Sequence, residues 1–182
     1  MAYRQVLRAL TLGVVAAAAM QAAQAAECTG NCGVSGADGV VTLPPSGNEY
    51  SWVSTRGGIA GVGQLAGYGG TNGSTLVSDA FFAAAGSRIE FWFNYVTSDG
   101  SGFADYAWSQ LTGAKTITLF TARTRPEGTI VPGFELPGVT ATLTPESVPI
   151  NPGGPSWTPL GNWSGTCYDS GCGHTGWVKS SF

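Results

Sequence analysis

Hydrophobic and polar side chains alternate along several short segments after residue 25, and a helical period is almost absent there. The clearest alternation runs from Arg88 to Val96, where every odd-numbered side chain from 89 to 95 is apolar or aromatic. Because successive side chains of a strand point to opposite faces, this pattern predicts a strand with one buried face. The same criterion predicts further strands at 50–55, 116–123, 139–143 and 176–179.

One segment fits two kinds of element. Residues 79–85 have the features of a short helix, with Asp79 as its N-cap and Gly86 as its stop. The apolar pairs at 76–77 and 81–82 suit a strand equally well, and we favour the strand.

Two stretches interrupt the strands and set the expected fold. Residues 57–73 are rich in glycine, which predicts a long loop or a loosely paired edge, and residues 145–159 hold five prolines. Proline lacks the N–H that a sheet ladder needs, so that stretch cannot form a central strand. Strands separated by turn-rich loops, without alternating helices, predict an all-β fold, and we expect a two-sheet antiparallel, jelly-roll-like β-sandwich.

The first 25 residues have the three zones of a secretory signal peptide. Arg4 and Arg8 provide the positive start, residues 9–20 are apolar and uncharged, and small residues follow. The apolar run is shorter than the roughly 20 residues that span a bilayer. We therefore expect a signal peptide at 1–25, cleaved before Ala26, and export of one β-sandwich domain to the cell surface or the extracellular space.

The charges of residues 26–182 limit the class of partner. This part of the chain holds six Lys and Arg residues against eleven Asp and Glu residues, a net charge of −5, without a cluster of basic residues in the sequence. Such an acidic balance argues against nucleic acid or an anionic membrane as a partner. Only 10% of all residues are charged, and uncharged polar side chains replace them.

The cysteines form two close pairs, Cys28 with Cys32 and Cys167 with Cys172. In an exported chain an even number of cysteines predicts disulfides, and three pairings are open. A zinc site is the alternative, because the C-x3-C and C-x4-C spacings have His174 nearby.

Two carboxylates flank a glycine-rich loop that follows the strongest predicted strand. Asp99 and Asp105, together with backbone carbonyls, offer oxygen ligands of the kind that Ca²⁺ accepts. The alternative is a hairpin loop in which the aspartates hydrogen-bond their own backbone as turn caps. Apart from the zinc alternative at the cysteines, calcium is the cofactor that the sequence suggests.

Aromatic residues concentrate between residues 157 and 177, which hold three of the six tryptophans. Flat rings beside amide, carboxylate and hydroxyl groups suit carbohydrates, because sugar C–H faces stack on aromatic rings. The alternative is that the tryptophans belong to the core. The candidate carbohydrate contacts are Trp157, Trp163, Tyr168 and Trp177.

Two sequence runs, FNYVTSDGSGFADYAW at 93–108 and GTCYDSGCGHTGWV at 165–178, carry a family resemblance. The chain from about residue 48 to 182 resembles exported bacterial proteins that often carry a C-terminal PEP-CTERM tag. Exosortase processes that tag in Gram-negative bacteria that make exopolysaccharide. The resemblance implies a surface or matrix protein without an assigned activity. Members of the family continue past the equivalent of Phe182 with further strands and the tag, so we expect a truncated copy or a released protein.

No pattern in the sequence matches a known catalytic site. His174 is the only side chain suited to proton transfer near neutral pH, and no Gly-x-Ser-x-Gly motif accompanies it. We therefore expect an exported, non-catalytic surface or matrix protein that binds exopolysaccharide. The alternatives are a structural or adhesive module without a ligand, and a secreted hydrolase that uses His174.

Overall fold

The computed structural model describes residues 25–182, so the predicted signal peptide, apart from Ala25, lies outside the described residues. Within this part the chain forms fourteen strands and one short 3-10 helix, η1 (Thr158–Trp163). The strands are β1 (Ala25–Thr29), β2 (Asn31–Ser35), β3 (Tyr50–Ser54), β4 (Ile59–Ala60), β5 (Asn72–Gly73), β6 (Thr75–Ser78), β7 (Glu90–Phe93), β8 (Val96–Thr97), β9 (Ala107–Thr112), β10 (Thr116–Ala122), β11 (Thr142–Thr144), β12 (Asn151–Pro152), β13 (Gly173–His174) and β14 (Val178–Ser181).

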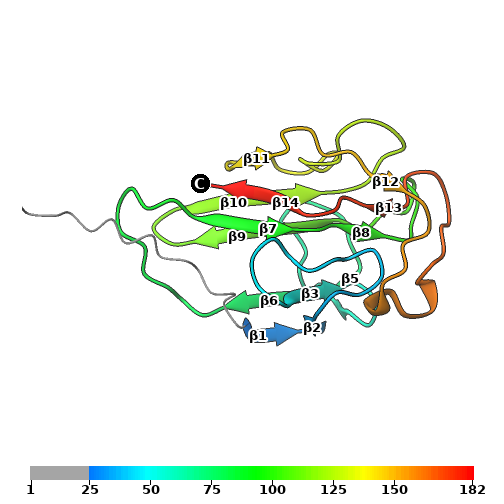
Figure 1. Cartoon of the computed structure of the whole chain (residues 1–182), viewed down its shortest axis with the longest axis horizontal. Helices are drawn as coiled ribbons and strands as arrows, with labels where there is room; N and C mark the ends of the chain where they lie inside the picture. Colours follow the sequence, from blue (N-terminus) through cyan, green and yellow to red (C-terminus); the bar gives the residue numbers. More distant parts are fainter. Residues whose placement is uncertain (1–24) are drawn as a thin grey trace, which may run out of the picture.

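Every pairing among these strands is antiparallel, and the strands form six small sheets. Two sheets have three strands, in the orders β11-β14-β7 and β12-β13-β8. The two-stranded sheets are β1-β6, β2-β3, β4-β5 and β10-β9. In Figure 1, strands β7 to β10, β13 and β14 lie together as an upper group, and β1 to β3, β5 and β6 lie below them as a lower group. The prediction of an antiparallel β protein is therefore confirmed.

The strand predicted at 88–96 is present as β7 followed by β8. Phe93 and Tyr95 are only 4% and 6% exposed, so the predicted alternating face is the buried one. The run is interrupted at Tyr95 because its N–H donates to the Thr175 hydroxyl at 2.9 Å instead of to a strand backbone. β7 pairs with β14 before this interruption, and β8 pairs with β13 after it.

Strand β10 is present where the pattern predicted it, and both of its faces are buried. The ring of Phe120 stacks on Phe93 with 3.9 Å between the centroids and lies 6.0 Å from Phe91. On the other face, Leu119 is 5% exposed and Thr121 is fully buried. Pairing with β9 shifts between Thr118 and Phe120, at an irregularity of the kind that re-aims side chains.

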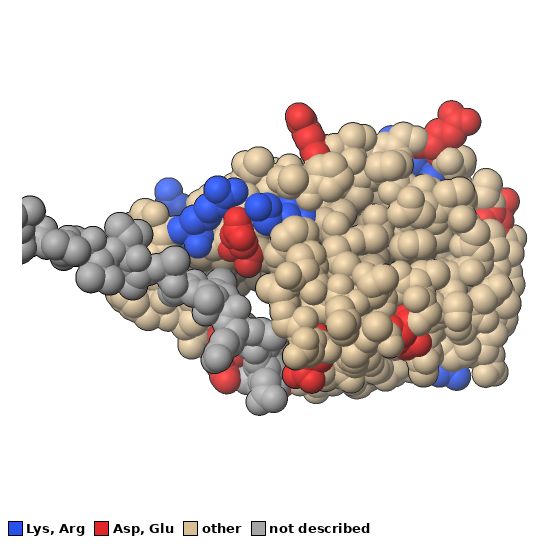
Figure 2. Space-filling view, viewed as in Figure 1, with Lys and Arg blue, Asp and Glu red and all other residues tan. Residues whose placement is uncertain are grey.

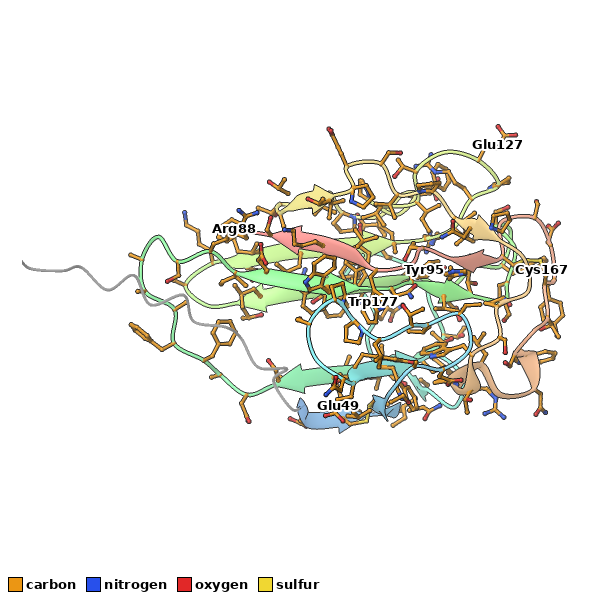
Figure 3. All side chains as sticks on the ribbon, in the orientation of Figure 1. Glu49, Arg88, Tyr95, Glu127, Cys167 and Trp177 are labelled. Carbon is orange, nitrogen blue, oxygen red and sulfur yellow. A yellow bond between two sulfur atoms is a disulfide. The ribbon has the colours of Figure 1, made fainter. Side chains whose placement is uncertain are left out.

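Two clusters of buried side chains form the core. The first lies in the upper group and consists of Phe93, Tyr95, Phe120, Ala122, Ile130, Val131, Val148 and Val178. The second consists of Val41, Tyr50 and Trp157, with Val40, Trp52, Val96, Leu160 and Trp177 packed against it. Since the second cluster contains residues of β3 and of β8, it joins the lower group to the upper group. Figure 3 shows the labelled Trp177 between the two groups.

Several predicted elements are shorter than expected or differ in kind. Residues 79–85 form neither the favoured strand nor a helix. β6 ends at Ser78, and the residues that follow are exposed and pair with no strand. The strand expected at 139–143 is present only as β11. The glycine-rich stretch is a loosely paired edge, as predicted, in which β4 and β5 pair over two residues. In the proline-rich stretch the one strand is the two-residue β12, which lies at a sheet edge, as the prolines require, and η1 begins near the end of the stretch.

We expect the substitution Phe93→Ala to lower the free energy of unfolding by about 3–5 kcal/mol, since it removes a buried ring stacked on Phe120 and leaves a cavity. Urea denaturation of the two proteins measures this difference. Phe103, which is 79% exposed, provides the matched control, and Phe103→Ala should change stability by less than about 0.5 kcal/mol. Equal losses for the two substitutions would contradict the assignment of the core.

Candidate functional site

Each cysteine pair closes on itself. Disulfides join Cys28 to Cys32 and Cys167 to Cys172, with Cα–Cα distances of 6.2 and 5.6 Å. All four thiols are thereby used, and the described residues contain no group of three or more metal-ligating side chains that could hold zinc. Disulfides form and persist in oxidising surroundings, so the two bonds indicate an environment outside the cytoplasm. Residues 25–182 contain no helix that is long and apolar enough to cross a membrane.

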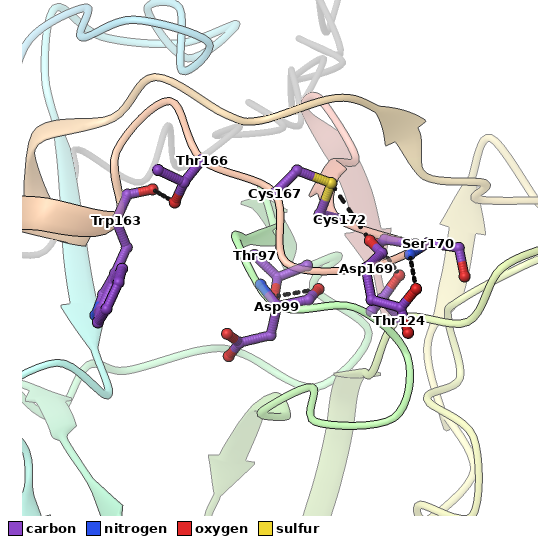
Figure 4. The surroundings of a disulfide bond; sticks show 10 residues. Thr97, Asp99, Thr124, Trp163, Thr166, Cys167, Asp169, Ser170 and Cys172 are labelled. Atoms are coloured by element: carbon purple, nitrogen blue, oxygen red, sulfur yellow. Dashed lines mark hydrogen bonds between the residues drawn. A yellow bond between two sulfur atoms is a disulfide. The ribbon is translucent and has the colours of Figure 1, made fainter.

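The second disulfide positions a loop against the glycine-rich loop that follows β8. The Tyr168 N–H donates to the Ser98 carbonyl at 3.0 Å, and the Ser101 N–H donates to the Ser170 carbonyl at 2.9 Å. Gly100 allows this close approach, because a Cβ at that position would overlap Asp169. The sequence runs 93–108 and 165–178 therefore meet at these two loops (Figure 4).

Two of the four candidate carbohydrate contacts lie mainly in the core. Trp157 is 8% exposed, and its indole N–H donates to the Tyr50 hydroxyl at 2.9 Å. Trp177 is half-buried, packs edge-on against Tyr50 with 5.6 Å between the centroids, and donates its N–H to the Thr42 carbonyl. Both indoles thus satisfy their polar group inside the protein and pack their rings against neighbours.

The other two candidates form an exposed pair, which we call the surface aromatic pair. Trp163 ends η1 and is 47% exposed, and Tyr168 lies in the disulfide loop and is 53% exposed. Their rings meet edge to face, with 5.0 Å between the centroids and 70° between the planes. Each ring therefore rests partly on the other and leaves surface open to solvent. Such a pair can stack on the apolar face of a ligand.

Asp99 follows Ser98, whose carbonyl accepts the hydrogen bond from the Tyr168 N–H. In Figure 4 the Asp99 carboxylate lies between Trp163 and the disulfide loop. Its side chain is half-buried, and burial raises the pKa of Asp99 above its ordinary value, with a smaller contribution from the charge of Asp105. A half-buried carboxylate beside exposed rings can accept hydrogen bonds from hydroxyl groups of a ligand.

The two aspartates predicted as calcium ligands are close enough to influence each other, since Asp105 raises the pKa of Asp99. Their backbone carbonyls already accept hydrogen bonds, from the Thr97 hydroxyl to Asp99 and from the Tyr95 hydroxyl to Asp105. The Thr97 hydroxyl also accepts from the Asp99 N–H at 3.1 Å and so caps this turn. Calcium binding stays a prediction for these two side chains.

His174 lies on β13, where it pairs with Val96 on one side and Asn151 on the other. Burial lowers the pKa of His174 below its ordinary value. The imidazole is therefore uncharged at neutral pH.

Comparison of the chain with protein-family models, with curated proteins and with solved structures gives no match.

We expect Asp99→Asn to raise the melting temperature at neutral pH. The raised pKa of Asp99 means that the folded protein disfavours the charged form, so stability declines as the pH rises above the ordinary value of 3.8. Asparagine carries no charge, so the gain should be present at about pH 7 and vanish near pH 3. Thermal melts in EGTA across this range measure it, and a variant that is less stable than the parent at neutral pH would contradict the burial argument.

The double substitution Cys167→Ser/Cys172→Ser should cost about 2 kcal/mol of stability, since it releases a short loop in the unfolded chain. It should also speed hydrogen exchange at the Tyr168 and Ser101 amides, which join the two loops. The matched control is Cys28→Ser/Cys32→Ser, which breaks a loop of similar length elsewhere and should leave these two amides protected. Equal exchange in both variants would show that the second disulfide does not hold this site.

Proposed function

We propose that this protein is an exported, non-catalytic carbohydrate-binding protein of the cell surface or extracellular matrix of a Gram-negative bacterium. The ligand is an exopolysaccharide, and the surface aromatic pair beside Asp99 is its binding site. The resemblance of residues 93–108 and 165–178 to exosortase-sorted surface proteins supports the location, and the two disulfides agree with it.

The fold that we propose for this role is a jelly-roll-like β-sandwich. The upper and lower groups of strands would be its two layers, with the second core cluster between them. The contacts that support this arrangement run from Tyr50 and Trp52 on β3 to Trp177, which precedes β14. Sandwiches of this kind place their connecting loops together at the ends, and such loops are where binding sites form.

The observation that carries the proposal is the exposure of Trp163 and Tyr168 on a loop held by a disulfide. Burying an aromatic side chain is worth roughly 1.5–3 kcal/mol, and two large rings that lie in contact and stay partly exposed support a surface that meets a ligand. The disulfide and the hydrogen bonds to residues 98–101 hold the rings in place before a ligand arrives. This preorganisation lowers the entropic cost of binding.

A structural module without a ligand is the second candidate, and the positions of Trp157 and Trp177 favour it. Both rings pack in the core around Tyr50. Stability of the core therefore explains two of the four aromatic residues that the sequence suggested as carbohydrate contacts. The exposed pair separates the two proposals, because Trp163 and Tyr168 contact each other on a disulfide-held loop, unlike the singly exposed Phe103 and Phe134.

We expect Trp163→Ala and Tyr168→Ala each to weaken polysaccharide binding at least about tenfold, since each removes one stacking face. Affinity electrophoresis through gels that contain dextran, galactomannan, xylan or the exopolysaccharide of the producing strain measures the retardation. Phe134, which is 51% exposed in a different loop, provides the matched control, and Phe134→Ala should bind like the parent. If no polysaccharide retards the parent protein, or if the control weakens binding equally, the proposal fails and the structural module stands.

A further inference from the structure

Arg56 lies in the turn between β3 and β4, and its guanidinium packs against η1. A Cβ at Gly161 would overlap the central carbon, Nε and one terminal nitrogen of this guanidinium together. The flat side of the guanidinium, and not its edge, therefore covers the backbone of residue 161. Arg56 is thus in contact with the helix that ends at Trp163.

The backbone of Arg56 is held at both of its polar groups. Its N–H donates to the Ser54 hydroxyl at 3.2 Å, and its carbonyl accepts from the Asn31 side-chain amide at 2.7 Å. The buried Ser54 hydroxyl in turn donates to the Pro159 carbonyl of η1 at 3.1 Å. The turn that carries Arg56 is therefore fixed both to the lower group of strands and to η1.

Gly161 is the point at which η1 departs from helical geometry. Its φ of 59° and ψ of −123° suit glycine, because glycine has no Cβ to oppose a positive φ. The Gly161 carbonyl accepts from the Ser164 N–H at 3.0 Å, and this turn encloses Trp163. The missing side chain has two consequences, since it allows the turn to form and leaves room for Arg56 to cover it.

We infer that Arg56 is a positioning residue of the carbohydrate-binding site, an inference that rests on the proposed function. Its guanidinium holds the Gly161 turn, and the turn holds the Trp163 ring against Tyr168, with 5.0 Å between the centroids. The Cys167–Cys172 disulfide supports the loop that carries Tyr168. Each ring of the surface aromatic pair thus has its own support, and a pair that is fixed before binding loses less entropy when a sugar stacks on it.

Packing, and not charge, is the basis of this role. Within the part of the chain that the structure describes, neither ion pair involves Arg56. Carboxylates lie near η1 as well, because Asp38 accepts from the Thr158 N–H at the start of the helix and Asp99 lies near Trp163 in Figure 4. This region therefore does not select an anionic ligand by its charge. A guanidinium is planar and weakly hydrated, so it packs on flat groups, whereas the ammonium of lysine is compact and strongly hydrated.

The test is affinity electrophoresis in the polysaccharide gel that retards the parent protein most. Arg56→Ala should weaken binding about threefold to tenfold, because the Trp163 ring is no longer held. Its melting temperature should stay close to that of the parent, since Arg56 is exposed. Hydrogen exchange at the Ser164 amide, which bonds Gly161, should become faster. Arg56→Lys should weaken binding as much as Arg56→Ala, because it keeps the charge and loses the planar group.

Arg88→Ala is the matched control, because it removes the same charge from an exposed arginine far from the site. Figure 2 shows a group of basic side chains at the end of the molecule where Figure 3 labels Arg88, and Figure 3 labels Cys167 of the disulfide loop at the opposite end. This variant should bind like the parent, and exchange at the Ser164 amide should not change.

A double-mutant cycle with Gly161→Ala measures the contact directly. The added Cβ displaces the guanidinium in the parent but has nothing to displace in Arg56→Ala. Gly161→Ala should therefore weaken binding about threefold more in the parent than in the Arg56→Ala background. The backbone cost of alanine at this positive φ is common to both backgrounds and cancels in the cycle.

The inference is overturned if Arg56→Ala or Arg56→Lys is retarded like the parent, if Arg88→Ala weakens binding equally, or if the cycle is additive. A lower melting temperature for Arg56→Ala, with unchanged exchange at the Ser164 amide, would overturn it as well. In each of these cases the retardation of the parent still supports carbohydrate binding. If no polysaccharide retards the parent, the proposed function and this inference fail together.

Discussion

The hydrogen bond from the Trp157 indole to the Tyr50 hydroxyl holds together parts of the protein that are far apart in sequence. It lies inside the second core cluster, where Trp52 and Trp177 pack around the same two residues. Trp157 immediately precedes η1, so its anchoring fixes where that helix begins. Its backbone N–H also donates to the Ser164 hydroxyl at 2.9 Å, which ties the residue after the exposed Trp163 to the buried ring. Burying the indole N–H without an acceptor would cost free energy of folding. The contact therefore favours this arrangement of the core over others as well as stabilising it.

Buried hydroxyl groups, and not charged side chains or long strand ladders, join several segments of this protein. Thr121, Ser180 and Ser54 are buried, and their hydroxyls donate to the carbonyls of Pro137, Leu119 and Pro159. Each bond ties an irregular segment or a neighbouring strand to a strand that is already packed. A protein with few charges and many short strands has many backbone carbonyls without ladder partners, and hydroxyl donors satisfy them at little desolvation cost. This explains how six small sheets hold long loops in fixed positions.

The parts of the fold that depend on local alternation could be predicted from the sequence, and the parts that depend on distant contacts could not. The faces of β7 and β10 follow from period-two patterns, although the burial of both faces of β10 required knowledge of what packs on each side. Ile130, Val131 and Val148 belong to the first core cluster but lie in irregular segments, so no periodicity marks them. The pairing of cysteines was open because all three pairings were compatible with the spacing. Of the four aromatic candidates for the site, the sequence did not separate Trp157 and Trp177 from Trp163 and Tyr168, since composition does not reveal which ring finds a hydrogen-bond acceptor in the core.

The exposed rings of Trp163 and Tyr168 differ from those of Phe81 and Phe82 in how firmly the backbone around them is held. Trp163 and Tyr168 are held by a disulfide and by backbone hydrogen bonds, so their rings keep one arrangement, as recognition of a defined sugar face requires. Phe81 and Phe82 lie in residues 79–88, where the Ser87 N–H donates to the Ala84 carbonyl and the Ser78 hydroxyl donates to the Asp79 carbonyl, and no disulfide supports them. This difference in support is why we place the sugar site at the disulfide loop and not at the more exposed Phe82.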